Sequence, residues 1–192
     1  MSESTPERLL KAAEAELIAQ DGLLEMTAVA KRAGASVGLA YHHFGSKAGL
    51  ISAVVERFYQ PLREVMMGPT GSDPESWSRA ERERFRRMVD YYFDHQLAPL
   101  LVGRLGREPA VIDMEREHLD ALLSEGARNL RAAQANGVLS PEMDADIAIG
   151  MIIGGIQQAL YRALHQQPRP DRSAFFEKLW ALLGALVRGG DR

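Results

Sequence analysis

Side chains that can contact a phosphate group or the edge of a nucleic-acid base are concentrated between Ser36 and Lys47. Tyr41 offers a hydroxyl group, and Lys47 offers an ammonium group. His42 and His43, which lie between them, offer imidazole nitrogens. Each of these groups donates hydrogen bonds to anionic oxygens. The stretch is therefore a candidate nucleic-acid site.

The distribution of charge points to the same stretch. The whole chain has a net charge of −3, which on average does not suit a polyanionic partner. From Met26 to Val55, however, the chain contains Lys31, Arg32 and Lys47 and no Asp or Glu. The local excess of positive charge favours an anionic partner for this segment alone.

The sequence excludes several other kinds of chemistry. Its 192 residues include no cysteine, so disulfides, iron–sulfur clusters and cysteine nucleophiles are excluded. It contains no phosphate-binding loop, dinucleotide fingerprint or serine-hydrolase elbow. Glu115 and His118 have the spacing of a di-iron motif, but a di-iron bundle needs a second copy. We expect no enzyme activity, no cofactor and no metal, with a site built from Asp94, His95 and His118 as the alternative.

The longest uncharged apolar stretch, residues 147–161, is shorter than the roughly 20 residues that span a membrane. The N-terminus lacks the basic and apolar regions of a secretion signal. A chain without cysteine also fits a reducing compartment. We therefore expect a cytoplasmic protein with no membrane partner.

Apolar residues recur at three- and four-residue spacing along almost the whole chain, which predicts an all-α protein of about nine helices. A first helix ends before Gly22 and a long one begins at Lys47, where Pro61 is expected to kink or end it. The other predicted helices cover residues 26–33, 37–43, 75–96, 99–105, 110–134, 145–164 and a last segment ending at Arg188. The predicted caps are Thr5, Ser36, Ser46, Asp144 and either Asp171 or Ser173. The clearest linker is the segment 68–74.

Two short predicted helices, 26–33 and 37–43, meet at a turn that contains Gly34 and Ala35. This is the anatomy of a helix-turn-helix, in which the second helix enters the major groove of DNA. The expected recognition helix is therefore 37–43.

The segment 38–47, Gly-Leu-Ala-Tyr-His-His-Phe-Gly-Ser-Lys, followed by Leu50, resembles the motif of the TetR family of bacterial transcriptional regulators. That motif has a small residue, then Tyr-x-His-Phe-x-x-Lys, and an apolar residue three further on. The segments 29–30 and 33–36 agree with it, and the resemblance covers about residues 5–58. It implies that DNA is contacted by Thr27, Ser36, Val37, Gly38, Leu39, Tyr41, His42, His43 and Lys47. Glu3, Glu7 and Glu25 depart from the basic or hydroxyl residues of the family and favour more salt-sensitive binding.

The resemblance also implies two domains. A helix-turn-helix domain is expected over residues 1–50, with the helix from Lys47 bridging to an effector-binding and dimerisation domain over 51–192. Such a domain binds a small molecule between its helices. The candidate pocket residues, which have pliable or polar-tipped side chains, are Met88, Tyr91, Tyr92, His95, Met114, His118, Met151, Gln157 and Tyr161.

The last two predicted helices are apolar on more than one side, which favours burial against a second copy of the chain. Glycines among them allow close backbone approach. The predicted dimer interface consists of Gly150, Ile153, Gly154, Phe176, Trp180, Leu183 and Val187. The alternative is a monomer with a deep core.

These expectations combine into a homodimeric transcriptional regulator, foremost a repressor, that binds a pseudo-palindromic operator in double-stranded DNA. A small-molecule effector would release it by moving the long helix that contains Pro61. An activator, or a DNA-binding protein without a ligand, would differ only in its regulation. The alternative from another class is a helical metal-binding or enzymatic dimer with a chance likeness to the motif.

Overall fold

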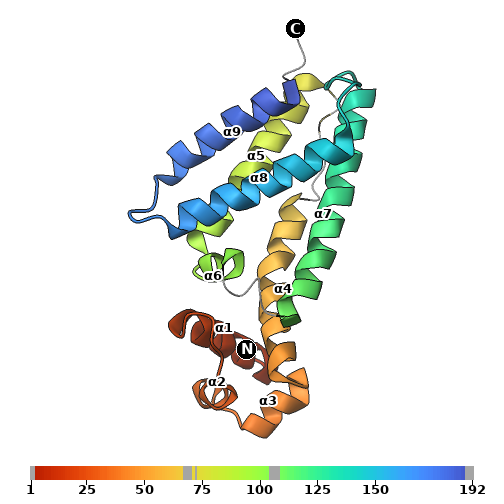
Figure 1. Ribbon diagram of the computed structural model, residues 1–192. Coiled ribbons are helices and arrows are strands. Elements are labelled where there is room, and N and C mark those ends of the chain that lie inside the picture. Colours follow the sequence, from red (N-terminus) through yellow and green to blue (C-terminus); the bar gives the residue numbers. More distant parts are fainter. Residues whose placement is uncertain (1–2, 67–70, 72, 104–108, 189–192) are drawn as a thin grey trace. The chain divides into compact units, whose positions relative to one another are not determined.

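The computed structural model describes residues 3–66, 71, 73–103 and 109–188, which form nine helices and no strand (Figure 1). The all-α prediction is confirmed. The helices are α1 (Thr5–Ala19), α2 (Met26–Ala33), α3 (Val37–Phe44), α4 (Lys47–Met66), α5 (Pro74–Asp94), α6 (Ala98–Val102), α7 (Pro109–Ala135), α8 (Ala145–His165) and α9 (Arg172–Arg188). For the helical residues 109, 110, 113–115, 187 and 188 only the backbone is described.

The chain divides into two compact units. The first contains residues 1–61 and 96–117, and the second contains residues 62–95 and 118–192. Helices α4 and α7 contribute residues to both. The division into domains at residue 50 remains a prediction.

Side-chain caps fix the starts of several helices, as the sequence predicts. Ser36 accepts a hydrogen bond from the Leu39 amide at 3.1 Å. Ser46, Asp144 and Asp171 accept from amides two or three residues further on. For α1 the prediction is wrong by one residue, because Ser4 has the extended backbone of a cap and accepts from the Glu7 amide at 3.4 Å.

Helices α1, α2 and α3 pack together in the first unit (Figure 1). The large side chains that are fully or almost fully buried in this unit include Leu9, Leu17, Leu24, Val29, Leu50, Val54 and Phe58. Arg8 of α1 donates from Nε to the Ala33 carbonyl at the end of α2, at 3.1 Å. Arg57 of α4 pairs with Glu7 of α1 at 2.6 Å. The start of α1 is thereby tied to α2 and α4.

In the second unit α5 packs against α9, and α8 contacts both (Figure 1). Phe93 and Phe175 bring α5 and α9 together with ring centroids 5.4 Å apart. Arg172 pairs with Asp94, and the pKa of its guanidinium is raised above the ordinary value, chiefly by that hydrogen bond. Aromatic packing and ion pairs therefore hold the same two helices.

A buried polar network joins α5 to α7. Glu81 and Arg84 form an ion pair in which both side chains are buried. Asn129 donates from Nδ2 to Glu81 Oε1 at 2.8 Å and accepts from Trp77 Nε1 at 3.4 Å. Satisfied partners are what make a buried charged pair tolerable.

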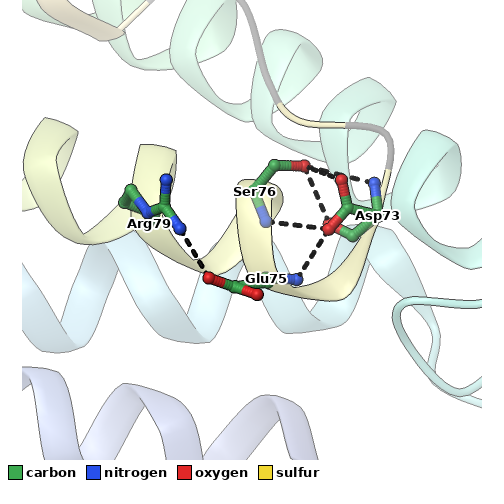
Figure 2. A network of polar contacts seen from close by, with 4 residues as sticks. All are labelled: Asp73, Glu75, Ser76 and Arg79. Atoms are coloured by element: carbon green, nitrogen blue, oxygen red, sulfur yellow. Dashed lines mark hydrogen bonds and ion pairs between the residues drawn. The ribbon is translucent and has the colours of Figure 1, made fainter.

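The first turn of α5 is closed by a reciprocal cap (Figure 2). The Asp73 carboxylate accepts from the amides of Glu75 at 3.1 Å and Ser76 at 3.0 Å. The Ser76 hydroxyl donates to that carboxylate and accepts from the Asp73 amide at 3.3 Å. One turn on, Arg79 pairs with Glu75 at 2.6 Å. Of the predicted linker 68–74, only Gly71, Asp73 and Pro74 belong to the described residues.

Helix α4 runs from Lys47 to Met66 and contains Pro61. The possibility that Pro61 ends the helix is therefore wrong. Proline removes one amide donor from the helix, and α4 continues for five residues beyond it.

Helix α8 is long and apolar, with a mean hydropathy of 1.3 over its best 18-residue window, so it meets the length and composition of a membrane span. Core and interface helices of soluble proteins meet the same criterion. Only 33% of that window is buried within the chain. Much of the apolar surface of α8 is therefore left uncovered by the chain itself.

Candidate nucleic-acid interface

The turn between α2 and α3 is set by one glycine and one serine. Gly34 ends α2 in the left-handed region, with a φ of 62°, which favours glycine. The Ala35 amide then donates back to the Ala30 carbonyl at 2.9 Å. Ser36 follows in an extended conformation and caps α3. The predicted helix-turn-helix is therefore present, with α3 as its second helix.

The turn after α3 places Lys47 at the first position of α4. A Cβ atom on Gly49 would lie 2.2 Å from the Phe44 carbonyl oxygen, so the end of α3 and the start of α4 touch through a glycine. Lys47 is exposed at a helix N-terminus, where the helix dipole disfavours a cation. A bound anion would offset that disadvantage.

Residues of α3 that are four positions apart lie on the same side of the helix, so its eight residues form four pairs. One pair faces the core of the unit, and the other three keep surface exposed to solvent. Ala40 is buried and Phe44, four residues on, is half-buried. The other positions pair at a spacing of four, which puts each pair on one strip of the surface. These pairs are Val37 with Tyr41, Gly38 with His42, and Leu39 with His43.

The nine residues predicted to contact DNA all retain exposed surface. Val37 and Leu39 are half-buried. The exposed members are Thr27, Ser36, Gly38, Tyr41, His42, His43 and Lys47. Eight of the nine lie between Ser36 and Lys47, and Thr27 lies in the first turn of α2.

Two of the three basic side chains in the segment 26–55 are without an ion-pair partner among the described residues. Lys31 and Lys47 are exposed and form no ion pair with any residue that the structure describes. Arg32 pairs with the buried carboxylate of Glu16 at 3.3 Å. Glu3 and Glu7, two of the three carboxylates that depart from the family pattern, are paired with Lys11 and Arg57. Lys31 was not among the residues predicted to contact DNA. Its position in the segment 26–55, which contains no Asp or Glu, is the sequence feature that makes it a further candidate.

The candidate pocket residues fall into two groups. Met88 is buried, and Tyr91, Tyr92, His95 and His118 are half-buried. Their counterparts on α8, Met151, Gln157 and Tyr161, are exposed. The side chain of Met114 lies outside the described residues.

The residues predicted for the dimer interface also differ in how far they are exposed to solvent. Gly150 and Gly154 are exposed, and a Cβ atom on either would meet nothing within 4 Å. Ile153 and Trp180 are half-buried, whereas Phe176 and Leu183 are buried within the chain, and the Val187 side chain lies outside the described residues. The predicted interface leaves out several exposed apolar side chains of these helices, including Ile147, Met151, Leu182 and Leu186.

Among the described residues no group of three His, Asp or Glu side chains is placed to hold a metal ion. The Asp94 carboxylate, part of the alternative metal site, is engaged by Arg172.

Comparison with known proteins identifies the class of the helix-turn-helix. Residues 9–54 match the family model of bacterial regulatory proteins of the tetR family. The chain is 30% identical over 159 residues to the HTH-type transcriptional regulatory protein RaaS of Mycobacterium tuberculosis, covering 78% of this chain and 67% of RaaS.

Solved structures agree with the fold over nearly the whole chain. SmeT, the repressor of the Stenotrophomonas maltophilia multidrug efflux pump SmeDEF, is 22% identical with a TM-score of 0.78, covering 98% of this chain and 93% of SmeT. A complex of SmeT with triclosan matches equally well. FadR of Bacillus subtilis in complex with stearoyl-CoA is 18% identical with a TM-score of 0.73, covering 94% of this chain and 98% of FadR. From its helix-turn-helix and these relationships, the chain belongs to the TetR family of bacterial regulatory proteins.

Proposed function

We propose that this transcriptional regulator is a homodimeric repressor that binds a pseudo-palindromic operator through α3 and is released from it by a small molecule. The observation that carries the proposal is the surface of α3. It is capped and largely solvent-exposed, and two nearby basic side chains, Lys31 and Lys47, have no ion-pair partner among the described residues. The segment 26–55 that contains them has no carboxylate side chain. The site of action is the cytoplasm, where bacterial DNA lies.

Phosphate contacts come from both ends of α3. Ser36 and the backbone amides of the first turn of α3 would bind one phosphate, because a helix N-terminus favours an anion. Tyr41, with 45% of its surface exposed, offers a hydroxyl, and Lys47 offers a full positive charge. These contacts fix the register of the helix in the groove, and Val37, Gly38, Leu39 and His42 meet the base edges.

Dimerisation uses the exposed apolar face of α8 and α9, formed by Ile147, Met151, Tyr161, Leu182 and Leu186. Leu182 has 70% and Ile147 has 64% of its surface exposed. Side chains so apolar and so exposed favour an oligomer interface. The open space above Gly150 and Gly154 would admit the backbone of the partner. A two-fold dimer presents two copies of α3 to two half-sites.

The effector binds among the inward residues of the second unit, Met88, Tyr91, Tyr92, His95 and His118. Complexes of SmeT with triclosan and of FadR with stearoyl-CoA support an apolar ligand class. The conformational change caused by the effector passes along α4 to the DNA-binding helices. Residues of α4 up to Pro61 belong to the first unit, and those from Leu62 onward belong to the second. A Pro61→Ala variant should need a different effector concentration to release half of the DNA.

The test is a titration of the purified protein against the duplex upstream of its own gene, with a random duplex as control, over a series of salt concentrations. Affinity for DNA falls with salt in proportion to the number of phosphates neutralised. Lys47→Ala should lower the slope of log affinity against log salt by about 2 per dimer, since two subunits each lose one contact.

Two further variants sharpen this test. Tyr41→Phe removes an uncharged donor, so it should weaken binding and leave the salt slope unchanged. Arg79→Ala, the matched control, removes an equal charge from an exposed surface pair of α5 and should change neither quantity. Equal effects of Lys47→Ala and Arg79→Ala would contradict the proposed interface.

A further inference from the structure

We infer that α3 reads its operator chiefly through thymine methyl groups, contacted by Val37 and Leu39, with Gly38 bringing the helix backbone close to the base edges. The inference rests on the proposed function, because it specifies which chemical groups of the DNA that interface recognises.

The first observation is the composition of α3, whose sequence is VGLAYHHF. Arg, Lys, Asn and Gln make the bidentate hydrogen bonds that distinguish guanine and adenine in the major groove, and Glu and Asp accept from cytosine. The helix contains none of these six residue types. Hydrogen-bonded readout from α3 is thus limited to the single donor or acceptor atoms of Tyr41, His42 and His43.

The second observation is the position of the apolar residues. In a helix-turn-helix, the first residues of the second helix contact the base edges. In α3 these residues are Val37, Gly38 and Leu39, and all three keep solvent-accessible surface. The hydrogen-bonding side chains begin one turn later, at Tyr41. The part of the helix that reaches deepest into the groove is therefore apolar.

The third observation is that the fold gives no reason for a glycine at position 38. Its φ is not in the left-handed region, and a Cβ atom there would meet only the Ser36 hydroxyl oxygen, at 3.9 Å. Glycine disfavours the helix relative to alanine. The missing side chain is explained by a surface outside the chain that approaches the backbone at this point, which lets the flanking Val37 and Leu39 reach the floor of the groove.

Only one group on the floor of the major groove is apolar. The C5 methyl of thymine offers contact to aliphatic side chains, whereas the other groups are hydrogen-bond donors and acceptors. Two aliphatic side chains on either side of a glycine therefore match thymines at neighbouring positions of each half-site.

The test uses the full-length protein and a duplex enriched by it from a pool of random sequences. Each thymine of the enriched duplex is replaced by deoxyuridine, one symmetric pair at a time. This change removes the C5 methyl and keeps every hydrogen-bonding group. Loss of one buried methyl should weaken binding about fourfold, or about fifteenfold when both half-sites are changed. We expect such losses at one or two thymine positions of each half-site and none elsewhere.

A double-mutant cycle assigns each methyl to its side chain. In Val37→Ala the deoxyuridine effect should disappear at one thymine position, and in Leu39→Ala at a different one. Val37 and Leu39 are half-buried, so both variants are first compared with the parent by thermal unfolding. The substitutions in the DNA need no variant, and they test the inference even if one of these proteins does not fold.

Replacement of purines by their 7-deaza analogues tests the alternative, in which α3 recognises bases by hydrogen bonds. This replacement removes the N7 acceptor that an imidazole or hydroxyl group would use. Sensitivity to deazapurines together with indifference to deoxyuridine would overturn the inference and assign readout to His42 and its neighbours. In that case the proposed function would stand. Failure of the protein to enrich any sequence would instead overturn the proposed function itself, and the inference with it.

Discussion

Two glycines near α3 have opposite structural roles, and this difference is visible at the scale of single atoms. A Cβ atom on Gly38 would make only an ordinary contact with the Ser36 hydroxyl oxygen at 3.9 Å, whereas one on Gly49 would collide with the Phe44 carbonyl oxygen at 2.2 Å. The fold therefore requires the second glycine, and we attribute the first to the close approach of DNA in the proposed interface.

Alanine at each position tests this assignment. Gly38→Ala should raise the free energy of unfolding by about 0.5 kcal/mol, because alanine favours the helix, and should weaken operator binding. Gly49→Ala should lower the free energy of unfolding, since backbone atoms have to move. Chemical denaturation and DNA titration of the two variants measure both quantities. A Gly38→Ala protein that binds its operator as tightly as the parent would contradict the role of this glycine.

Features that depend on neighbouring residues in the sequence, such as helix caps, could be predicted from residue types alone. The caps Ser36, Ser46 and Asp144 are read from residue types within four positions of a helix start, and the structure confirms them. The network of Glu81, Arg84 and Asn129 escaped such reasoning, because Glu81 and Asn129 are 48 residues apart and nothing in the local sequence marks them as neighbours.

Helix α5 is capped at its start by the carboxylate of Asp73 (Figure 2). The pKa of Asp73 is lowered below its ordinary value, first by the hydrogen bond from the Ser76 side chain and then by the Ser76 amide. A depressed pKa means that the folded state favours the carboxylate. The stabilisation is present above the unfolded pKa and is lost as pH falls through the folded one.

An Asp73→Asn variant separates this charge from the shape of the cap, because asparagine also caps helices well. The variant should unfold at a lower temperature than the parent at pH 7. The difference should shrink as pH falls below the ordinary carboxyl range, since the parent loses its charge there as well. Thermal unfolding followed by circular dichroism at several pH values measures the effect, and a difference independent of pH would rule out an electrostatic contribution of Asp73.

For helices α8 and α9, the sequence did not show which side of each helix faces the core and which faces outward. Both sequences are apolar on more than one side, so their pattern could not distinguish the side that faces the chain from the side that faces outward. Phe176 and Leu183 were assigned to the dimer interface but are buried within the chain. Leu182 and Leu186, one position before and three after Leu183, carry the exposed apolar surface.

For the whole molecule, the proposed dimer makes the exposed apolar face of α8 and α9 essential to assembly. Leu182→Glu would place a carboxylate from each subunit in that interface without a partner, at a cost of several kcal/mol. The dimer dissociation constant should therefore rise at least about 100-fold. Sedimentation equilibrium over a range of protein concentrations measures it.

Leu23→Glu is the matched control for this variant. Leu23 is 54% exposed and belongs to the first unit, outside the proposed interface. The same substitution there should leave the dissociation constant unchanged. Equal dissociation in both variants, or a parent protein that is monomeric at every concentration, would contradict the proposed dimer.

In the proposed complex, two copies of α3 contact two half-sites of one operator. Hydroxyl-radical footprinting of the parent protein on its enriched duplex distinguishes this arrangement from binding at a single site. We expect two protected segments related by a two-fold axis, with centres about 34 Å or a small multiple of one helical turn apart. Lys47→Ala should weaken the protection of both segments equally. A single protected segment, or protection that survives changes in α3 and at Lys47, would rule out this arrangement.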